Sequence, residues 1–438
     1  MIADLRDPRA PGRSRSRGTI HARLARSRSR PQAGCRSGAA MGRETGRDAA
    51  IAEPPEGRRM SAEDRSEVRR IVLVAAHWLG DTFWALQTVP FLQGQHPGAR
   101  LRLLLRPELR WLGRLWLPDA QLISARGLVS DRRREPIWRS LWLGADARAV
   151  RQAGGRIDLW IDFTRTRASD LLARLVRPRQ RLGRRRQTVA AGTHLALQPW
   201  AILAPRYAQG PGWPAETRQR RPRLPRAALA QVAGGPRPAG GLARERSEES
   251  EWSAAREILL FPGAGWPEKR WPLDLWLELA HHLSEDGNDV TLLFAPREEA
   301  LWRAARAALE GAPPGRPACR VTRGRELLHK LVAARAVVAH DSGAAHLAAA
   351  LGVPTVALYG PTNPRICGPL GSRVRILRTR CAERPDGGQH HCHDRPARRC
   401  DRQGMRDITT ADVVSALRAL VGGGDRKVRC RGLRAGSA

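Results

Sequence analysis

Residues 336–362 constrain the fold of this chain more than any other stretch. An apolar run at 336–339 has the length of a strand, 344–351 is rich in helix formers, and 355–359 is a second apolar run. A glycine and a proline separate the helical run from the second apolar run, where they end the helix and turn the chain. This order and spacing predict a strand–helix–strand unit of a parallel α/β sheet.

The turn after the first of these strands carries the polar residues His340, Asp341, Ser342 and Gly343. Asp341 or Ser342 can cap the following helix, whose first N–H groups and positive dipole end suit a phosphate or diphosphate. His346 lies about one helical turn further on and can face the same ligand. The alternative is an ordinary capped helix with no ligand, and for a short motif of this kind that alternative is the commoner one.

The whole string DSGAAHLAAALGVPTVALYGPTNP resembles the C-terminal signature of the heptosyltransferases, glycosyltransferase family 9. The match is long and nearly ungapped. The resemblance implies an α/β chain of the GT-B class, with two Rossmann-like domains facing each other across a cleft. We expect it to cover residues 71–420, more loosely in the N-terminal half.

A second segment, PGAGWPEKRWP after the predicted strand 257–261, resembles the family segment whose lysine contacts the nucleotide diphosphate. The resemblance gives that role to Lys269, and the tight turn at Gly263 lets the backbone approach a ligand. Lys269 is one of three lysines in a chain with 77 basic residues, which indicates a need for a compact ammonium. Glu298 follows the predicted strand 289–294, where family members place a residue near the nucleotide ribose. Its alternative is a surface carboxylate at a helix start.

The resemblance extends the predicted nucleotide-sugar pocket to the residues of the first motif. Asp341, Ser342, Gly343 and His346 would line the pocket together with Lys269.

The N-terminal half opens with a predicted buried strand at 71–76, followed by HWLGDTFWALQTVPFL. Ligands of doubly wound sheets bind at the carboxyl ends of such strands. Asp81 taken alone is most simply a helix N-cap. Family members carry L-G-D at this turn, so the resemblance makes Asp81 the general base that deprotonates the sugar acceptor. Gln87 stands where family members usually have proline.

Composition divides the chain into five predicted segments. Residues 1–69 are a disordered basic extension or follow from a wrongly assigned start, since Met41 and Met60 are alternative starts. Residues 70–208 form the acceptor-binding domain and 254–421 the nucleotide-sugar-binding domain. A flexible Pro-, Gly- and Arg-rich linker at 209–253 joins them, and 422–438 is a basic tail.

The formal net charge of +35 is carried almost entirely by arginine. A basic surface attracts anionic lipid headgroups, so peripheral contact with an anionic membrane is one expectation. Nucleic acid would be attracted as well, but no recognition module accompanies the charge, and we predict no specific nucleic-acid binding. We expect a cytoplasmic protein, at most peripheral at the inner face of the plasma membrane, because no apolar run approaches the ~20 residues of a membrane span and no secretory signal is present.

The segment 381–400 gathers cysteines and histidines, the residue types of a zinc site, in spacings that fit no zinc motif. We therefore predict no metal site and no cofactor. By resemblance, Lys269 and a helix N-terminus would hold the charge of the departing diphosphate without a metal ion.

The resemblance implies transfer of a sugar, heptose, from ADP-heptose or a similar donor to a lipopolysaccharide core or a related glycan. Two alternatives remain open at this point. A nucleotide-sugar epimerase on the same fold would leave no acceptor glycosylated, and a non-catalytic relative would bind nucleotide or glycan without turnover.

Overall fold

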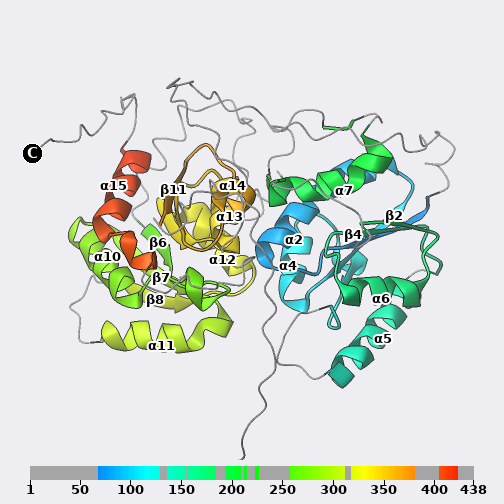
Figure 1. The fold of residues 1–438 in the computed structure, drawn as a ribbon, viewed down its shortest axis with the longest axis horizontal. Coiled ribbons are helices and arrows are strands. Elements are labelled where there is room, and N and C mark those ends of the chain that lie inside the picture. The colour runs from blue at the N-terminus through cyan, green and yellow to red at the C-terminus, as the bar shows by residue number, and fades with distance from the viewer. Residues whose placement is uncertain are drawn as a thin grey trace, which may run out of the picture. The chain divides into compact units, whose positions relative to one another are not determined.

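The computed structural model describes residues 68–128, 136–153, 155–183, 193–208, 212–214, 222–225, 257–310, 317–379 and 404–422. The predicted extension and tail, most of the predicted linker and the Cys/His segment 381–400 lie outside these residues. The described part contains two parallel β-sheets, one of five and one of six strands, each flanked by helices (Figure 1). Both sheets belong to one compact unit, Asp48–Ala438.

The first sheet has the strand order β3-β2-β1-β4-β5. Its strands are β1 (Arg70–Val74), β2 (Arg100–Leu105), β3 (Leu122–Ser124), β4 (Leu159–Asp162) and β5 (Gln180–Leu182). β1 lies in the middle, with Leu73 paired to Leu103 on one side and to Ile161 on the other. Ile71 through Val74 are all buried, as expected of a central parallel strand covered on both faces. The strand order reverses between β1 and β4.

Among the described residues, six helices accompany this sheet: α2 (Leu79–Leu86), α3 (Val89–Gln95), α4 (Arg110–Gly113), α5 (Pro136–Gln152), α6 (Arg167–Val176) and α7 (Gln198–Tyr207). Thr166 and Ser169 fix the start of α6 through a capping box, in which each side chain bonds the other residue's backbone N–H. Gln87 ends α2, and its side chain donates to the Phe83 carbonyl at 3.0 Å.

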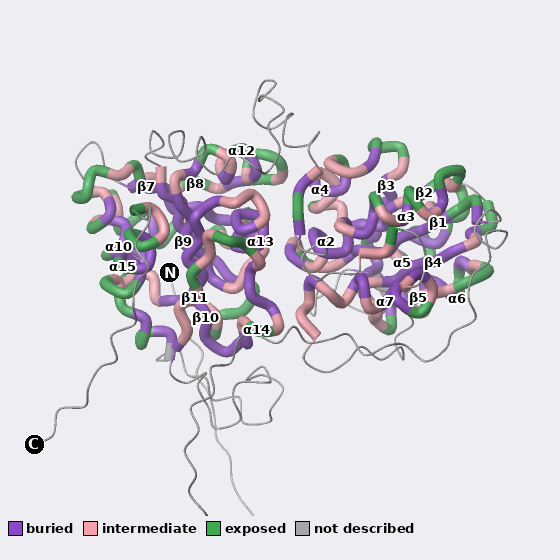
Figure 2. Tube along the Cα trace, turned by 90° about the horizontal axis from the view of Figure 1, so that it is seen from above, coloured by how far each residue is buried: buried purple, intermediate pink, exposed green. Residues whose placement is uncertain are grey.

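The second sheet has the order β11-β10-β9-β6-β7-β8. Its strands are β6 (Glu257–Phe261), β7 (Asp289–Phe294), β8 (Ala318–Val321), β9 (Ala336–His340), β10 (Thr355–Tyr359) and β11 (Val374–Arg378). Read from β8, this is the 3-2-1-4-5-6 order of a dinucleotide-binding sheet, in which the order reverses between the first and fourth strands. Those strands are β6 and β9, and Figure 2 shows β9 buried.

The helices of this half are α10 (Leu273–Glu285), α11 (Glu299–Ala308), α12 (Arg325–Ala333), α13 (Gly343–Ala350), α14 (Pro364–Cys367) and α15 (Thr410–Val421). None of the helices in the described part of the chain is both long and apolar enough to cross a bilayer.

The buried face of α10 differs from the apolar stripe that its sequence predicts. The pattern favours Leu273, Trp276, Leu277 and Ala280, whereas the structure buries Trp276, Leu279, Ala280 and Leu283. Trp276 fixes the rotation of the helix, since its ring is fully buried against Trp271 at 5.2 Å between centroids. Positions three, four and seven residues after Trp276 then face the core, and Leu273 and Leu277 are left half-buried.

Candidate functional site

The polar residues of both predicted motifs lie at the carboxyl edge of the second sheet, where the strand order reverses. β6 and β9 are direct neighbours there, with Phe261 paired to Ala339. Gly263 follows β6 after one residue, and Asp341 follows β9 directly. A crevice forms outside such a reversal because the connections leave the two strands toward opposite faces of the sheet.

Lys269 and Asp341 form an ion pair at this edge, 2.6 Å between Nζ and Oδ2. Lys269 closes the short 3-10 turn Pro267–Lys269, and the ring centroid of Trp266 lies 4.3 Å from its ammonium. The two side chains are 15% and 9% exposed. Burial alone would raise the pKa of Asp341, but the positive charges of Lys269 and His346 outweigh it and lower that pKa. The site therefore holds a buried carboxylate with its cation.

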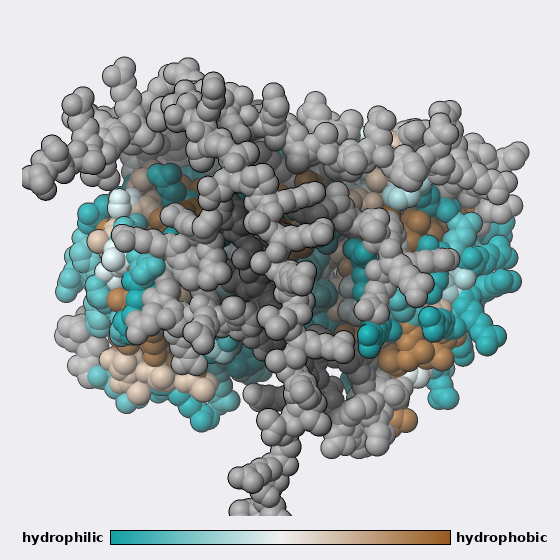
Figure 3. All heavy atoms as spheres, viewed as in Figure 1, coloured by the Kyte–Doolittle hydropathy of each residue, from teal (hydrophilic) through white to brown (hydrophobic). Residues whose placement is uncertain are grey.

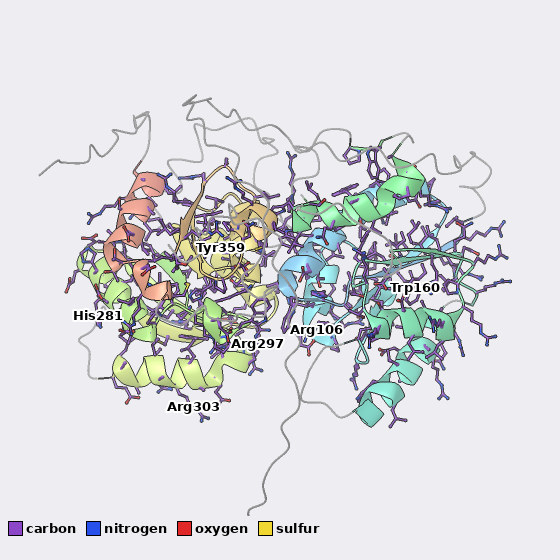
Figure 4. All side chains as sticks on the ribbon, viewed as in Figure 1. Arg106, Trp160, His281, Arg297, Arg303 and Tyr359 are labelled. Atoms are coloured by element: carbon purple, nitrogen blue, oxygen red, sulfur yellow. The ribbon has the colours of Figure 1, made fainter. Side chains whose placement is uncertain are left out.

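Tyr359, the last residue of β10, adds a hydroxyl beside the same carboxylate (Figure 4). Its oxygen lies 3.3 Å from Asp341 Oδ1 and donates to the Cys367 carbonyl at 2.9 Å. Burial raises the pKa of Tyr359 well above its usual value, so the hydroxyl stays protonated. The sequence prediction missed Tyr359, although it belongs to the string that carries the resemblance.

His340 ties the glycine turn to the start of α10, and the sequence prediction gave it no role. Its Nε2 accepts from the Trp271 N–H at 2.7 Å, and its Nδ1 donates to the Gly263 carbonyl at 3.2 Å. Burial lowers the pKa of His340 to about 4, so the ring is neutral and these partners fix its tautomer. The loop that carries Lys269 is thereby held at both ends.

Glu298 packs directly over Gly263, so the structure brings these two predicted residues together. A Cβ on Gly263 would lie 2.1 Å from the Glu298 carboxyl carbon, which leaves no room for any side chain there. Glu298 accepts from the Ala295 N–H at 2.8 Å, and burial raises its pKa despite that bond. The alternative of a surface carboxylate is wrong, because the side chain is only 9% exposed.

The predicted position of the α13 cap is confirmed at Ser342, but a capping bond from its side chain is not. Ser342 occupies the N-cap position but makes no capping bond through its side chain, and Asp341 points to Lys269 instead. Within the described residues the Ser342 hydroxyl is buried with no hydrogen-bond partner. A buried hydroxyl at a helix N-terminus, left without a protein partner, is available to a ligand.

Gly343 and His346 face α2 of the first sheet. A Cβ on Gly343 would lie 2.7 Å from the side chain of Leu79. The His346 ring packs edge-on against Trp84 at 4.6 Å between centroids, and its Nε2 lies 3.9 Å from Asp341 Oδ1. Burial lowers the pKa of His346, although Asp341 and Asp81 oppose that effect. His346 thus spans the distance between the ion pair and α2.

Asp81 lies in the first turn of α2, after the central strand of the first sheet. The interpretation of Asp81 as an N-cap is wrong, because Trp78 occupies that position and Asp81 is the third residue of the helix. Its Oδ2 lies 2.6 Å from His77 Nδ1. A Cβ on Gly80 would meet His346 at 3.0 Å, so the turns that carry Asp81 and Asp341 pack against each other.

No metal centre accompanies these residues. In the part of the chain that the structure describes, no group of three or more His, Cys, Asp or Glu side chains is arranged to hold a metal ion. The Cys/His segment 381–400 falls outside that part.

Comparison with known proteins identifies the second half of the chain. Residues 227–393 match the family model of glycosyltransferase family 9 (heptosyltransferase). This region is therefore similar to the glycosyltransferase family 9 domains. The resemblance stated from the sequence is therefore confirmed for this part of the chain.

The chain also aligns in part with curated heptosyltransferases. Lipopolysaccharide heptosyltransferase 2 of Escherichia coli strain K12 is 34% identical over 175 residues, which is 39% of this chain and 48% of that protein. Lipopolysaccharide heptosyltransferase 1 of Pseudomonas aeruginosa is 40% identical over 139 residues, 31% of this chain and 38% of that protein. The chain thus spans less than half the length of these relatives in sequence.

The structural likeness reaches further along the chain. A glycosyltransferase family 9 protein from Veillonella parvula superposes with a TM-score of 0.58 at 18% identity, covering 82% of this chain and 98% of its own. The E. coli ADP-heptose lipopolysaccharide heptosyltransferase II superposes with a TM-score of 0.57 at 22% identity. The match covers 80% of this chain and 98% of that chain. These likenesses, with the two parallel sheets, confirm the predicted GT-B class of two Rossmann-like domains.

Proposed function

We propose that this family 9 protein transfers heptose from ADP-heptose to a lipopolysaccharide core or a related glycan. The observation that carries the proposal is the buried Lys269–Asp341 pair at the reversal of the second sheet, inside the region that matches the family. The relatives support the choice of sugar and acceptor, since they are named lipopolysaccharide heptosyltransferases. A solved E. coli heptosyltransferase with ADP supports the choice of nucleotide.

In this proposal the second domain, 254–421, binds the donor and stabilises the leaving diphosphate. Lys269 would share its charge between Asp341 and the diphosphate, and the N-terminus of α13 would add backbone N–H groups. The unpartnered hydroxyl of Ser342 supports a hydrogen bond to the same group. Asp341 and His346 would shape the sugar pocket.

The ribose end of the donor would lie near Gly263 and Glu298. Their contact supports this placement, because the missing side chain of Gly263 lets the Glu298 carboxylate pack against the turn after β6. A carboxylate is a suitable acceptor for ribose hydroxyls, as in other dinucleotide-binding sheets. No metal or other cofactor is part of the proposal.

The first domain, 70–208, would bind the acceptor, which loses its proton at the start of α2, where Asp81 lies. We propose a cytoplasmic protein in peripheral contact with the inner face of the plasma membrane. The exposed leucines Leu141, Leu171 and Leu175 support that contact, since they lie on α5 and α6 among exposed arginines. Figure 3 shows hydrophilic residues over much of the described surface on one face, with smaller hydrophobic patches between them.

Calorimetric titration with ADP, UDP and GDP tests the donor pocket. We expect one nucleotide, ADP, to bind the wild-type protein and to bind Lys269→Ala at least about tenfold more weakly, which is about 1.4 kcal/mol. Lys330→Ala is the matched control, because Lys330 pairs with Glu257 at 3.0 Å and belongs to neither motif. It should bind ADP as the wild type does. Circular dichroism must show that all variants are folded.

Product analysis then separates transfer from the two alternatives. The wild type is incubated with ADP-heptose and a lipopolysaccharide core that lacks heptose. Mass gain of the core by one heptose supports the proposal, whereas an altered donor with an unchanged core indicates an epimerase. Binding of ADP without any product indicates a non-catalytic relative, and no nucleotide binding by a folded protein refutes the donor pocket.

A further inference from the structure

The turn after β1 contains a pair of side chains for which the family resemblance gives only one member a role. His77 precedes α2, and Asp81 lies four residues later in the first turn of that helix. His77 Nδ1 and Asp81 Oδ2 are 2.6 Å apart. A neutral imidazole bonded in this way donates its Nδ1–H to the carboxylate, and its lone pair is then on Nε2. In the described part of the chain, Nδ1 makes the only side-chain hydrogen bond of this ring.

We propose that His77 accepts the proton of the acceptor hydroxyl on Nε2 and that Asp81 is a positioning residue that holds the imidazole. This inference rests on the proposed glycosyl transfer and changes the identity of the base. Histidine held by a carboxylate is the common arrangement where an alcohol must be activated as a nucleophile.

The geometry favours His77 over Asp81 as the group that meets the acceptor. One oxygen of Asp81 is engaged in the short bond to His77. The His77 side chain is 40% exposed and can release a proton to solvent, and the Asp81 side chain is 35% exposed. An imidazole is also a stronger base than a carboxylate near neutral pH, which suits it to deprotonate a hydroxyl in the transition state.

The neighbouring residue Trp78 places this turn beside the donor-binding half of the molecule. The Trp78 ring centroid lies 4.9 Å from the Arg106 guanidinium and 5.0 Å from that of Arg297 (Figure 4). Arg297 directly precedes Glu298, the residue proposed for the ribose end of the donor. His77 is therefore adjacent to a residue that contacts both halves.

The charged groups around His77 tune its basicity. Burial disfavours the imidazolium and Arg106 also opposes it, whereas the hydrogen bond and charge of Asp81 and the charge of Asp162 favour it. The contributions that favour the imidazolium outweigh those that oppose it, so the pKa of His77 is raised. Arg106 follows β2, Asp81 lies on α2 and Asp162 ends β4, so these groups face the ring from three elements.

The proposed step is a single displacement. The acceptor oxygen forms a bond to the anomeric carbon while the bond from that carbon to the diphosphate oxygen breaks, and the electron pair leaves with ADP. The acceptor proton moves to His77 Nε2, and the resulting imidazolium is stabilised by Asp81. The proton then passes to solvent.

The test is the pH dependence of kcat/KM for heptose transfer, with the heptose-deficient core as acceptor. The wild type should lose activity on acidification with a limb above the usual histidine pKa of about 6.5, because protonated His77 cannot accept the proton. His77→Gln should lower kcat/KM by about 10²–10⁴-fold and abolish this limb. Asp81→Asn should also lower the rate, since it no longer fixes the tautomer. His282→Gln, at an exposed histidine of α10, is the control and should behave as the wild type.

ADP titration of each variant keeps the outcomes distinct, because it reports an intact fold and donor pocket independently of proton transfer. The inference is overturned if His77→Gln retains activity within a few-fold while Asp81→Asn loses it. The inference is equally overturned if the activity of the wild type falls only near pH 4, where carboxylic acids titrate. This measurement uses the wild type alone. A wild type that binds ADP but transfers no heptose refutes the proposed function itself.

Discussion

Replacing Lys269 by methionine should destabilise the protein far more than an ordinary surface substitution. Methionine preserves most of the volume of the side chain but leaves Asp341 buried, at 9% exposure, without its cation. Breaking a buried ion pair by removing one partner typically costs about 3–5 kcal/mol. Tyr359 and His346 still surround the carboxylate, so we expect about 3 kcal/mol, at the lower end of that range.

The double variant Lys269→Met/Asp341→Asn separates this loss from other effects of the substitution. It removes both charges, and a neutral pair at such a site is often close to wild-type stability. We expect it to recover about 2 kcal/mol relative to Lys269→Met, because no unpaired charge is then left buried.

The pH dependence of the same loss has a definite sign. In the wild type the pKa of Asp341 is lowered, so the pair contributes stability above the unfolded pKa of about 4, and that contribution is lost as pH falls through the folded pKa. In Lys269→Met the carboxylate lacks its cation and its protonation favours the folded state. The difference in unfolding free energy between the two proteins should therefore be largest near pH 7 and shrink toward pH 4.

Urea denaturation followed by circular dichroism measures these free energies, with Lys330→Met as the matched control at a half-buried pair. Lys330 and its partner Glu257 are 27% and 24% exposed, so that variant should lose about 1 kcal/mol at most. Equal losses in the single and double variants, at every pH, would show that Lys269 and Asp341 are not coupled in solution.

Two further substitutions test the packing around the site. Gly343→Ala should lower the free energy of unfolding by about 1–3 kcal/mol, because the added Cβ would overlap Leu79. Gly265→Ala, at a position with open space, should leave that free energy unchanged. Urea denaturation of both variants checks this. His340→Phe should cost about 1–3 kcal/mol and weaken ADP binding, since it leaves the buried Trp271 N–H without its acceptor; unchanged calorimetric titration and denaturation would contradict this role.

The sequence predicts the buried strands of both sheets with little error. The runs at β6, β7 and β10 were predicted with the bounds that the structure shows, and β1 and β9 differ by one or two residues at an end. Continuous apolar runs of this length are easy to recognise because parallel strands are buried on both faces. Glycine and proline mark the turns that end them.

Three of the four edge strands were not predicted; the fourth, β3, was predicted one residue too long at its start. β5, β8 and β11 read QRL, ACRV and VRILR, with arginines that interrupt the apolar run, and their side chains are mostly half-buried or exposed. α7 was missed for another reason, since its sequence QPWAILAPRY contains Pro199 near its start and Pro205 inside it. Proline usually ends a helix, so the pattern argued against the element that the structure contains.

The sequence predicted individual site residues, but it did not predict which of them contact each other. Spacing places Asp81 and Asp341 after central strands, but it cannot show that Lys269 reaches Asp341 across 72 positions of the chain. His340 was placed in the turn after a strand and Tyr359 in a strand, and their hydrogen bonds depend on the glycine turn and on α14. The His77–Asp81 pair is the exception, because residues four apart at a helix start are near neighbours and the sequence alone could have indicated it.

Both sheets carry a pair of charged or polar side chains beyond their central strands, and we propose that the difference in burial suits the two pairs to different chemical tasks. Each places a carboxylate and a cationic or basic partner beyond the carboxyl ends of its central strands. The pair in the second sheet is largely buried, so its charges are weakly screened and act strongly on a ligand that carries negative charge. The pair in the first sheet is more than a third exposed, so a proton taken up there can return to water. In the proposed reaction, the dry pair therefore suits the departing diphosphate and the hydrated pair suits the acceptor hydroxyl.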